Sequence, residues 1–349
     1  MNELHPANAG RTILLTGAGG SIGSALARAI VRSTPRLLVL LDHSEYNLRR
    51  IELELPGILG YTEHVSIIGD ICDSALLTRI FETYRPDVVY HSAAFKHVPL
   101  MEMNPVAAIR NNAMGTFNLA KAANQCEAGR LIMISTDKAV NPRSVMGASK
   151  RVAELVSLRC SNARSQMMVL RLGNVLGSLG SVVPLFLQQI SRGGPVTVTH
   201  RDVNRYFLTM TEAVELILTT AGLEESGGIF VPEMGEPVRI LDLACDLIRT
   251  AGLEPGKDIQ IVFTGLRPGD KMSEELLGPS ECFEVSSAPG IYRIISSRAL
   301  PNTFDSAITE LADGVLRRDT ASMLETLCKI VPEYRPSEAL LGLLNHSPA

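Results

Sequence analysis

A glycine-rich segment directly after an apolar strand constrains the fold more than any other part of this chain. Arg11 to Thr16 has the length and composition of a buried strand and runs straight into Gly17-Ala-Gly-Gly-Ser-Ile-Gly23. A helix is expected from about Ser21 to Arg32. In this order of elements, backbone N–H groups can approach a pyrophosphate at the helix N-terminus. The cofactor contacts predicted here are Gly17, Gly19, Gly20, Ser21, Ile22 and Gly23.

A carboxylate follows at the spacing typical of dinucleotide-binding proteins. The second apolar strand, Leu37 to Leu41, ends in Asp42, which is 42 − 23 = 19 residues after the last glycine. An acid about 20 residues on binds the ribose hydroxyls of NAD. Because a carboxylate repels a 2′-phosphate, Asp42 favours NAD over NADP. The alternative is a structural glycine turn with Asp42 as a capping residue.

Apolar strands and helices continue to alternate after Asp42. This order predicts right-handed βαβ units and an α/β fold, a Rossmann-type doubly wound parallel sheet with a smaller C-terminal substrate-binding lobe. The NAD-binding domain is expected over residues 1–173, with 208–231 returning to it, and the lobe with the C-terminal helices over 174–349. Further strands are predicted at 65–68, 86–90, 131–134, 167–172 and 228–231, and helices at 44–55, 74–84, 104–123, from about 144, at 211–220, 240–251 and through 303–329.

Small and polar residues follow the third and fourth predicted strands at the same edge of the sheet. Small side chains let a ligand approach the backbone closely, so we expect dinucleotide contacts at Asp70, Ile71, Ala93 and Ala94. Asn111 and Asn112 lie inside the predicted helix 104–123 although adjacent amides are poor helix formers. Such residues are tolerated for a tertiary hydrogen bond, and Asn112 is predicted near the cofactor.

The segment from Ile134 to Lys150 carries the candidate acid–base groups. Thr136, Asp137 and Lys138 end a buried strand at the edge where open parallel sheets bind their ligands. Met146 and Lys150 are four residues apart on the following helix and share one face. A hydroxyl, a carboxylate and two amines are thus expected close together. Alternatively, these are ordinary polar residues at a strand end and a solvated lysine.

Composition narrows the classes of function. The 349 residues carry a net charge of −4, so no basic excess indicates nucleic acid, and the apolar runs are too short to cross a membrane. Met1 to Gly10 shows no signal-peptide features. Six scattered cysteines without a C-x-x-C pair are typical of reduced thiols in a cytoplasmic protein, and the dispersed histidines predict no metal site.

These segments resemble the extended short-chain dehydrogenase/reductase superfamily and, more narrowly, the bacterial UDP-N-acetylglucosamine 4,6-dehydratases of polysaccharide and glycan biosynthesis. The similarity covers about residues 11–277. It rests on Thr16-Gly-Ala-Gly-Gly-Ser-Ile-Gly23, Ala94-Phe-Lys-His-Val-Pro-Leu-Met-Glu102, Ser135-Thr-Asp-Lys-Ala-Val-Asn-Pro142, Met146-Gly-Ala-Ser-Lys-Arg151, Arg171-Leu-Gly-Asn-Val-Leu-Gly-Ser178, Thr197-Val-Thr-His-Arg-Asp-Val-Asn-Arg-Tyr206 and Gly265-Leu-Arg-Pro-Gly-Asp270.

The chain departs from the family pattern in three places. Met146 stands where the superfamily has a catalytic Tyr, and a Met cannot take a proton. A subgroup of the dehydratases shares this Met. Many of those relatives carry an N-terminal membrane domain, whereas about ten residues precede the first strand here. After about residue 278 the pattern is lost.

The resemblance implies an internal redox reaction with bound NAD, without metal, on a UDP-sugar, in an enzyme similar to others that form homo-oligomers. Thr136 would pass on the 4-hydroxyl proton and Asp137 would protonate the leaving hydroxyl. Lys138 would be the base at carbon 5, with its pKa lowered by burial and a cation such as Lys150. Lys150 would bind the nicotinamide ribose. Substrate contacts are expected at Lys96, also near the cofactor, and at His97, Asn174, Arg205 and Arg267.

Purely structural roles remain possible for several of these positions. Arg267 lies in Arg-Pro-Gly-Asp, which is a good turn sequence, and Asn174 could simply end a strand. Lys96 and His97 could be structural loop residues. Two other functions are also open: a UDP-sugar 4-epimerase or 4-reductase on the same fold, and a non-catalytic NAD-binding regulator. Epimerases keep the Tyr, whereas a regulator would not need Thr136, Asp137, Lys138 and Lys150.

Overall fold

The computed structural model describes residues 6–345. Met1 to His5, half of the segment in which no signal peptide is predicted, lie outside the described residues. Its main element is a nine-stranded sheet in the order β14-β15-β11-β6-β5-β4-β1-β2-β3, in which the strands from β11 to β3 are parallel. The strands are β1 (Thr12–Thr16), β2 (Leu37–Asp42), β3 (His64–Ile68), β4 (Val88–His91), β5 (Arg130–Thr136), β6 (Gln166–Leu172), β11 (Gly228–Pro232), β14 (Glu281–Val285) and β15 (Ile291–Ser296). The predicted α/β Rossmann-type fold is confirmed.

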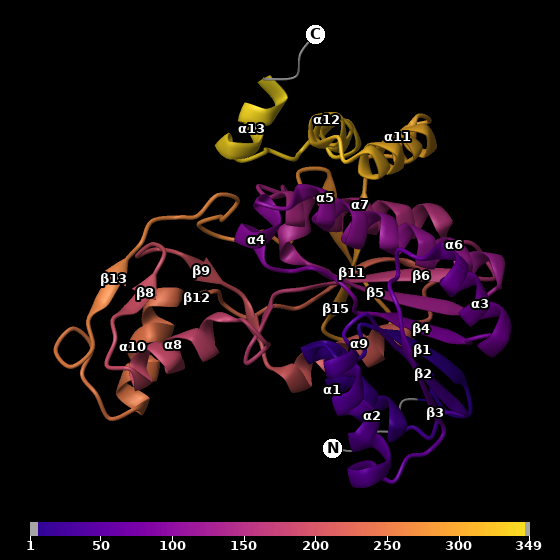
Figure 1. Cartoon of the computed structure of the whole chain (residues 1–349), viewed down its shortest axis with the longest axis horizontal. Coiled ribbons are helices and arrows are strands. Elements are labelled where there is room, and N and C mark those ends of the chain that lie inside the picture. The colour runs from indigo at the N-terminus through magenta and orange to yellow at the C-terminus, as the bar shows by residue number, and fades with distance from the viewer. Residues whose placement is uncertain (1–5, 346–349) are drawn as a thin grey trace.

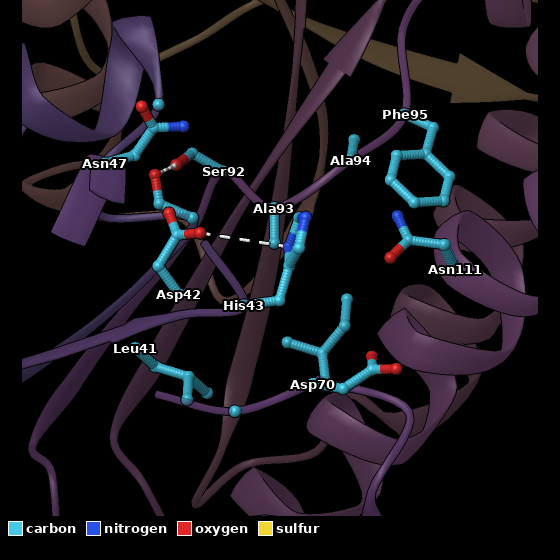
Figure 2. A pocket seen from close by; sticks show the side chains of 14 residues that line it. Leu41, Asp42, His43, Asn47, Asp70, Ser92, Ala93, Ala94, Phe95 and Asn111 are labelled. Carbon is cyan, nitrogen blue, oxygen red and sulfur yellow. Dashed lines mark hydrogen bonds and ion pairs between the residues drawn. The ribbon is translucent and has the colours of Figure 1, made fainter. Parts of the chain in front are cut away.

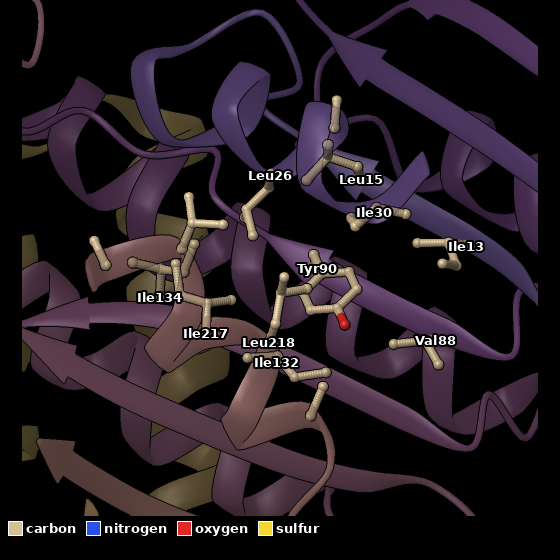
Figure 3. Packing of buried hydrophobic residues seen from close by; sticks show 14 of the residues in the cluster. Ile13, Leu15, Leu26, Ile30, Val88, Tyr90, Ile132, Ile134, Ile217 and Leu218 are labelled. Atoms are coloured by element: carbon tan, nitrogen blue, oxygen red, sulfur yellow. The ribbon is translucent and has the colours of Figure 1, made fainter. Parts of the chain in front are cut away.

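Helices cover both faces of this sheet, which is why its central strands are apolar on both sides (Figure 1). One face packs against α1 (Ser21–Val31), α2 (Glu45–Leu59) and α9 (Met210–Ala221). Figure 3 shows part of this cluster, with Ile13 and Leu15 of the sheet on the side of Ile30. The other face presents Leu14 and Val39. It packs against α3 (Ser74–Tyr84), α6 (Gly115–Gln125) and α7 (Val145–Cys160).

The helix predicted over 104–123 is not one regular helix. After α4 (Val98–Glu102) the chain forms α5 (Pro105–Ala108), then a π-helix, η1 (Ile109–Met114), and only then α6. The wider π-turn contains Asn111 and Asn112. The Asn112 amide bonds to residues outside the helix, whereas the Asn111 amide donates to Asn112 Oδ1. Tertiary hydrogen bonds have overridden local helix geometry here, as is common for π-turns near functional sites.

A small lobe lies beside the carboxyl edge of the sheet (Figure 1). Its own apolar cluster includes Phe186, Val196 and Ile248. Two short strand pairs, β7 (Asn174–Val175) with β10 (Phe207–Leu208) and β9 (Asn204–Arg205) with β12 (Val238–Arg239), lie where the chain passes into and out of it. The lobe's other elements are α8 (Val182–Ser191), β8 (Val196–Val198), α10 (Ile240–Thr250) and β13 (Ile261–Phe263).

The C-terminal segment returns to the sheet domain. Strands β14 and β15 extend the main sheet in antiparallel fashion. The helical periodicity over 303–329 forms two helices, α11 (Phe304–Arg317) and α12 (Thr320–Ile330), which are separated at Arg318 with φ 56°. These helices and α13 (Glu338–Asn345) form a third layer over α7 and α5 (Figure 1). The division at residue 173 stays a prediction, and no helix within residues 6–345 has the length and apolarity to span a membrane.

Candidate active site

The glycine loop is held against the end of β2 by Asp42. Asp42 Oδ2 accepts a hydrogen bond from Gly19 N at 2.9 Å, and Oδ1 accepts one from Ser44 N at 2.8 Å. The loop lies so close to β4 that a Cβ on Gly17, whose φ is +66°, would be 2.7 Å from Ala93 N. Only glycine fits this position. The loop backbone and the N-terminus of α1 therefore face a space in which a dinucleotide pyrophosphate fits.

A pocket extends from this loop along the carboxyl ends of β1, β2 and β4 (Figure 2). Of the predicted cofactor residues, Gly17, Gly20, Asp42, Asp70, Ile71, Ala93 and Ala94 line it. Other lining residues were not predicted from the sequence. His43 is one of them, and its ring meets Phe95 edge-on at 6.2 Å between centroids. The others are Leu41, Asn47, Gly69, Ser92, Phe95 and Asn111.

Asn112 fixes the loop that forms one wall of the pocket. Its amide N–H groups donate to Phe95 O at 2.9 Å and to Ser149 Oγ at 3.1 Å, and its Oδ1 accepts from Phe95 N at 2.8 Å. The expected tertiary hydrogen bond is thus confirmed. Because Ser149 lies on α7, Asn112 ties the wall of the pocket to the helix that carries Lys150. Its contact with a cofactor stays a prediction.

The end of β5 brings together the central candidate residues. Thr136 Oγ1 donates to Asp137 Oδ1 at 2.9 Å, and Lys138 Nζ donates to the same oxygen at 3.0 Å. Lys138 Nζ also donates to Asn174 Oδ1 at 2.8 Å, which joins the strand ends of β5 and β7. Asp137 is fully buried and its Oδ2 has no hydrogen-bond partner among the described residues. Three of the four predicted acid–base groups therefore form one connected cluster with Asn174, whereas the fourth, Lys150, donates to the backbone of Ile134.

The charge on Lys138 is stabilised, not suppressed. Burial disfavours the ammonium form, but Asp137 and Glu274 outweigh burial and the nearby Arg205, and the pKa of Lys138 is raised. Glu274 Oε1 lies 3.6 Å from Lys138 Nζ. The prediction that burial and a cation such as Lys150 lower the pKa of Lys138 is therefore wrong. Glu274 follows the last quoted motif by only four residues, but nothing in sequence spacing indicates this contact.

Lys150 and Met146 lie on the buried side of α7. Lys150 Nζ donates to Ile134 O at 2.7 Å, and burial lowers the pKa of Lys150 to about 8, against the opposing effect of Glu154. The amine with the lowered pKa is thus Lys150. Met146 is 3% exposed and belongs to an apolar cluster with Val98 and Met101.

The predicted substrate-binding residues differ in their burial and in the contacts that their side chains already make. Arg205 is buried, and its guanidinium donates to the backbone oxygens of Asn204, Met272 and Lys271, whereas Arg267 is exposed and pairs with Asp270 at 2.9 Å. Lys96 Nζ donates to Ser178 Oγ at 3.2 Å, and the His97 ring lies against Gly180.

A second pocket joins Lys138 to Arg205. It is lined by Val98, Lys138, Arg143, Ser144, Arg205, Gly269, Asp270, Lys271 and Glu274.

A buried ion-pair network supports the cluster from below. Arg171 donates to Glu154 Oε2 at 2.9 Å and to Glu281 Oε2 at 2.7 Å, and all three side chains are almost fully buried. Glu154 also accepts from Ser135 Oγ at 2.7 Å, next to Thr136. The network joins β6, α7 and β14 beneath the end of β5. The sequence analysis did not identify it, since its members are distant in sequence.

A parallel sheet with a glycine loop, an acid at the end of β2 and a Thr-Asp-Lys cluster at the end of β5 defines the extended short-chain dehydrogenase/reductase class. Within this class, the chain belongs to the polysaccharide biosynthesis protein family, whose pattern matches residues 13–296. The family match ends at β15, so α11, α12 and α13 lie outside it.

Three known proteins illustrate the similarity. The capsular polysaccharide biosynthesis protein CapD of Staphylococcus aureus is 48% identical over 286 residues, which are 81% of this chain and 48% of CapD, so the chain spans about half of CapD's length. A UDP-glucose 4-epimerase of Rickettsia akari is 31% identical over 294 residues, which are 81% of this chain and 82% of the epimerase. The X-ray structure of Pen from Bacillus thuringiensis superposes with a TM-score of 0.74 at 30% identity, covering 83% of this chain and 87% of Pen.

Proposed function

We propose that this chain is a nucleotide-sugar 4,6-dehydratase that converts UDP-N-acetylglucosamine to a UDP-2-acetamido-2,6-dideoxy-4-keto-hexose with NAD. The observation that carries the proposal is the contact of Thr136 and Lys138 with the same Asp137 oxygen, at 2.9 and 3.0 Å. Loss of water across carbons 5 and 6 needs both a base and an acid beside the sugar. Family membership and the glycine-loop pocket support the proposal.

The cluster provides a closed route for the protons. Thr136 takes the proton of the 4-hydroxyl and passes it through its existing hydrogen bond to Asp137, which delivers it to the hydroxyl that leaves carbon 6 as water. Lys138 first releases its ammonium proton to solvent, then removes the proton from carbon 5 and later returns a proton there. Bound NAD would supply the hydride acceptor for carbon 4 and, once reduced, the hydride donor for carbon 6. The reaction therefore consumes no cofactor and releases one water.

The chain's own residues fit this cofactor. Asp42 would meet the ribose hydroxyls, and the backbone of Gly17 to Gly20 with the α1 N-terminus would bind the pyrophosphate. Lys150, on the helix beside the pocket, would hydrogen-bond the nicotinamide ribose. Asn174 would orient Lys138 toward the sugar. Cation contacts to the diphosphate are proposed at Arg205 and Arg267, with Lys96 and His97 on the opposite loop.

The test is mass spectrometry of purified protein incubated with UDP-N-acetylglucosamine in deuterated water without added cofactor. We expect a product that has lost one water and gained one deuterium at carbon 5. Unchanged substrate with bound NAD and no exchange at carbon 5 would contradict this substrate or this reaction. The same assay with other UDP-sugars distinguishes a wrong substrate from a wrong reaction.

A UDP-sugar 4-epimerase is the second candidate, because the similar Rickettsia akari protein carries that name. An epimerase product has the mass of the substrate, so the experiment above distinguishes the two reactions. Met146 at the position of the superfamily Tyr disfavours epimerisation. A cytoplasmic location and a homo-oligomeric state stay predictions.

A further inference from the structure

Glu274 is a buried carboxylate for which the proposed reaction has no role. Its side chain is 3% exposed and lies in the second pocket, on the segment between β13 and β14. Oε1 lies 3.6 Å from Lys138 Nζ and 3.6 Å from Arg205 Nε. Oε2 is buried without a hydrogen-bond partner among residues 6–345, and it lies 3.7 Å from Lys271 Nζ. Three cations thus surround one carboxylate.

All three cations also have other contacts, and Lys138 donates to Asp137 and Asn174. Arg205 donates to three backbone oxygens, and Lys271 Nζ donates to Val140 O at 2.7 Å. All three cations line the second pocket, and Lys138 is the most exposed of them, at 20% against 11% for Arg205 and 9% for Lys271. Burying a carboxylate destabilises the folded protein unless the charge is paired. The arrangement therefore holds the carboxylate in place through Arg205 and Lys271 and presents it to Lys138.

We propose that Glu274 is a positioning residue that keeps Lys138 protonated and directed at Asn174 and Asp137. The inference rests on the proposed function only in naming Lys138 as the base at carbon 5. Glu274 would set the pH at which that base becomes available. It would also hold the Lys138 ammonium within the pocket when no proton is being transferred.

The other groups that face Lys138 determine how its pKa should change when the charge of Glu274 is removed. Asp137 lies 3.0 Å away and favours the ammonium form, Arg205 opposes it, and Thr136 and Asn174 are neutral. Removing the charge of Glu274 leaves burial, Arg205 and Lys271 opposed by Asp137 alone. An opposite charge at this distance shifts a pKa by about one unit or more. Glu274→Gln should therefore lower the pKa of Lys138.

The experiment is trace labelling with acetic anhydride from pH 6 to 11, with acetylation of Lys138 measured by peptide mass spectrometry. Lys257, whose side chain is 75% exposed, reports reagent activity in the same sample. We expect Lys138 of Glu274→Gln to react about tenfold faster than wild type at a fixed pH below its pKa. Glu274→Asp should restore much of the wild-type rate.

Glu275→Gln is the matched control. It removes the same charge at the next position, and Glu275 is half exposed and 4.0 Å from Lys271. We expect its Lys138 to react as in wild type. Equal Lys138 titration in Glu274→Gln and wild type, both folded by circular dichroism, would overturn the proposal. If Glu274→Gln does not fold, wild type still decides, because a Lys138 pKa below the ordinary value of about 10.4 contradicts the proposal.

Labelling does not depend on turnover, so this test and that of the proposed function fail separately. A lower pKa of Lys138 in Glu274→Gln, in a protein that does not dehydrate the sugar, would support the role of Glu274 and reject the reaction. Dehydration by wild type, with an unchanged Lys138 pKa in Glu274→Gln, would support the reaction and reject the role of Glu274.

Discussion

The side chains of Ser337 and Glu102 are 235 positions apart in the sequence and are joined by a hydrogen bond of 2.6 Å. The other carboxylate oxygen of Glu102 accepts from Val145 N, the first residue of α7, at 2.7 Å. Arg335 N donates to Pro142 O at 3.0 Å in the same region. A segment beyond the family match thus supports the start of the helix that carries Lys150.

Removing these contacts should destabilise the protein in a graded way. Ser337→Ala removes one hydrogen bond and should lower the free energy of unfolding by about 1 kcal/mol. Glu102→Ala also leaves the buried Val145 N–H unpaired and should cost about 2 kcal/mol or more. Urea denaturation measures both. A Glu102→Ala variant as stable as wild type would show that the tail does not support α7 through this contact.

Lys138→Ala should abolish loss of water and leave NAD binding intact. Lys138 lies in the second pocket, whereas Asp42 and the glycine loop line the first. Loss of a general base costs about 100- to 10,000-fold in rate. The readouts are product by mass spectrometry and the NAD content of the purified variant. Wild-type turnover in Lys138→Ala would remove Lys138 from the mechanism.

Asp42→Ala should weaken NAD binding by roughly tenfold or more, because one charged hydrogen-bond acceptor for the ribose is worth at least about 1.5 kcal/mol. The variant also frees Gly19 N, so the loop loses a contact. Asp42→Asn keeps an acceptor and is the milder control. Calorimetric titration with NAD gives both affinities, and an undiminished affinity in Asp42→Ala would place the ribose contact elsewhere.

Met146 should contribute packing and no proton transfer. Met146→Leu conserves volume and should retain most activity at a cost below about 1.5 kcal/mol. Met146→Ala leaves a cavity in an apolar cluster and should cost about 2–4 kcal/mol while the folded fraction stays active. Activity per folded molecule separates these effects. Its complete loss in folded Met146→Leu would give the Met a chemical role.

The buried network predicts acid sensitivity. Burial alone would raise the pKa of Glu154, but Arg171, Arg151 and the Ser135 hydrogen bond outweigh it and lower the pKa to about 2. Since the folded pKa lies below the unfolded value of about 4.3, this stabilisation is present above pH 4.3 and is lost as pH falls toward 2. The loss amounts to about 3 kcal/mol. Thermal melts from pH 5 to 2.5 measure it, and Glu154→Gln, which lacks this titration, should show a flatter profile.

Local sequence patterns predicted the features that depend on neighbouring residues. Alternating apolar strands and helices gave the parallel sheet, and the glycine spacing gave the loop that Asp42 holds. The cluster at Thr136 to Lys138 followed from its place at a strand end. Features made by distant segments were not predictable in this way. Glu274 reaches Lys138 across 136 positions, and β14 and β15 join the sheet through backbone pairing that their composition does not specify.

The hydrogen bonds of the π-turn at Ile109 to Met114 span one residue more than those of an α-helix, so the turn changes the angular position of the residues that follow it in α6. Each residue of an α-helix turns the chain by about 100°. Deleting a single residue here would restore regular winding but rotate Asn112 away from Phe95 and Ser149. A one-residue change in length would then separate the loop that lines the first pocket from the helix that carries Lys150.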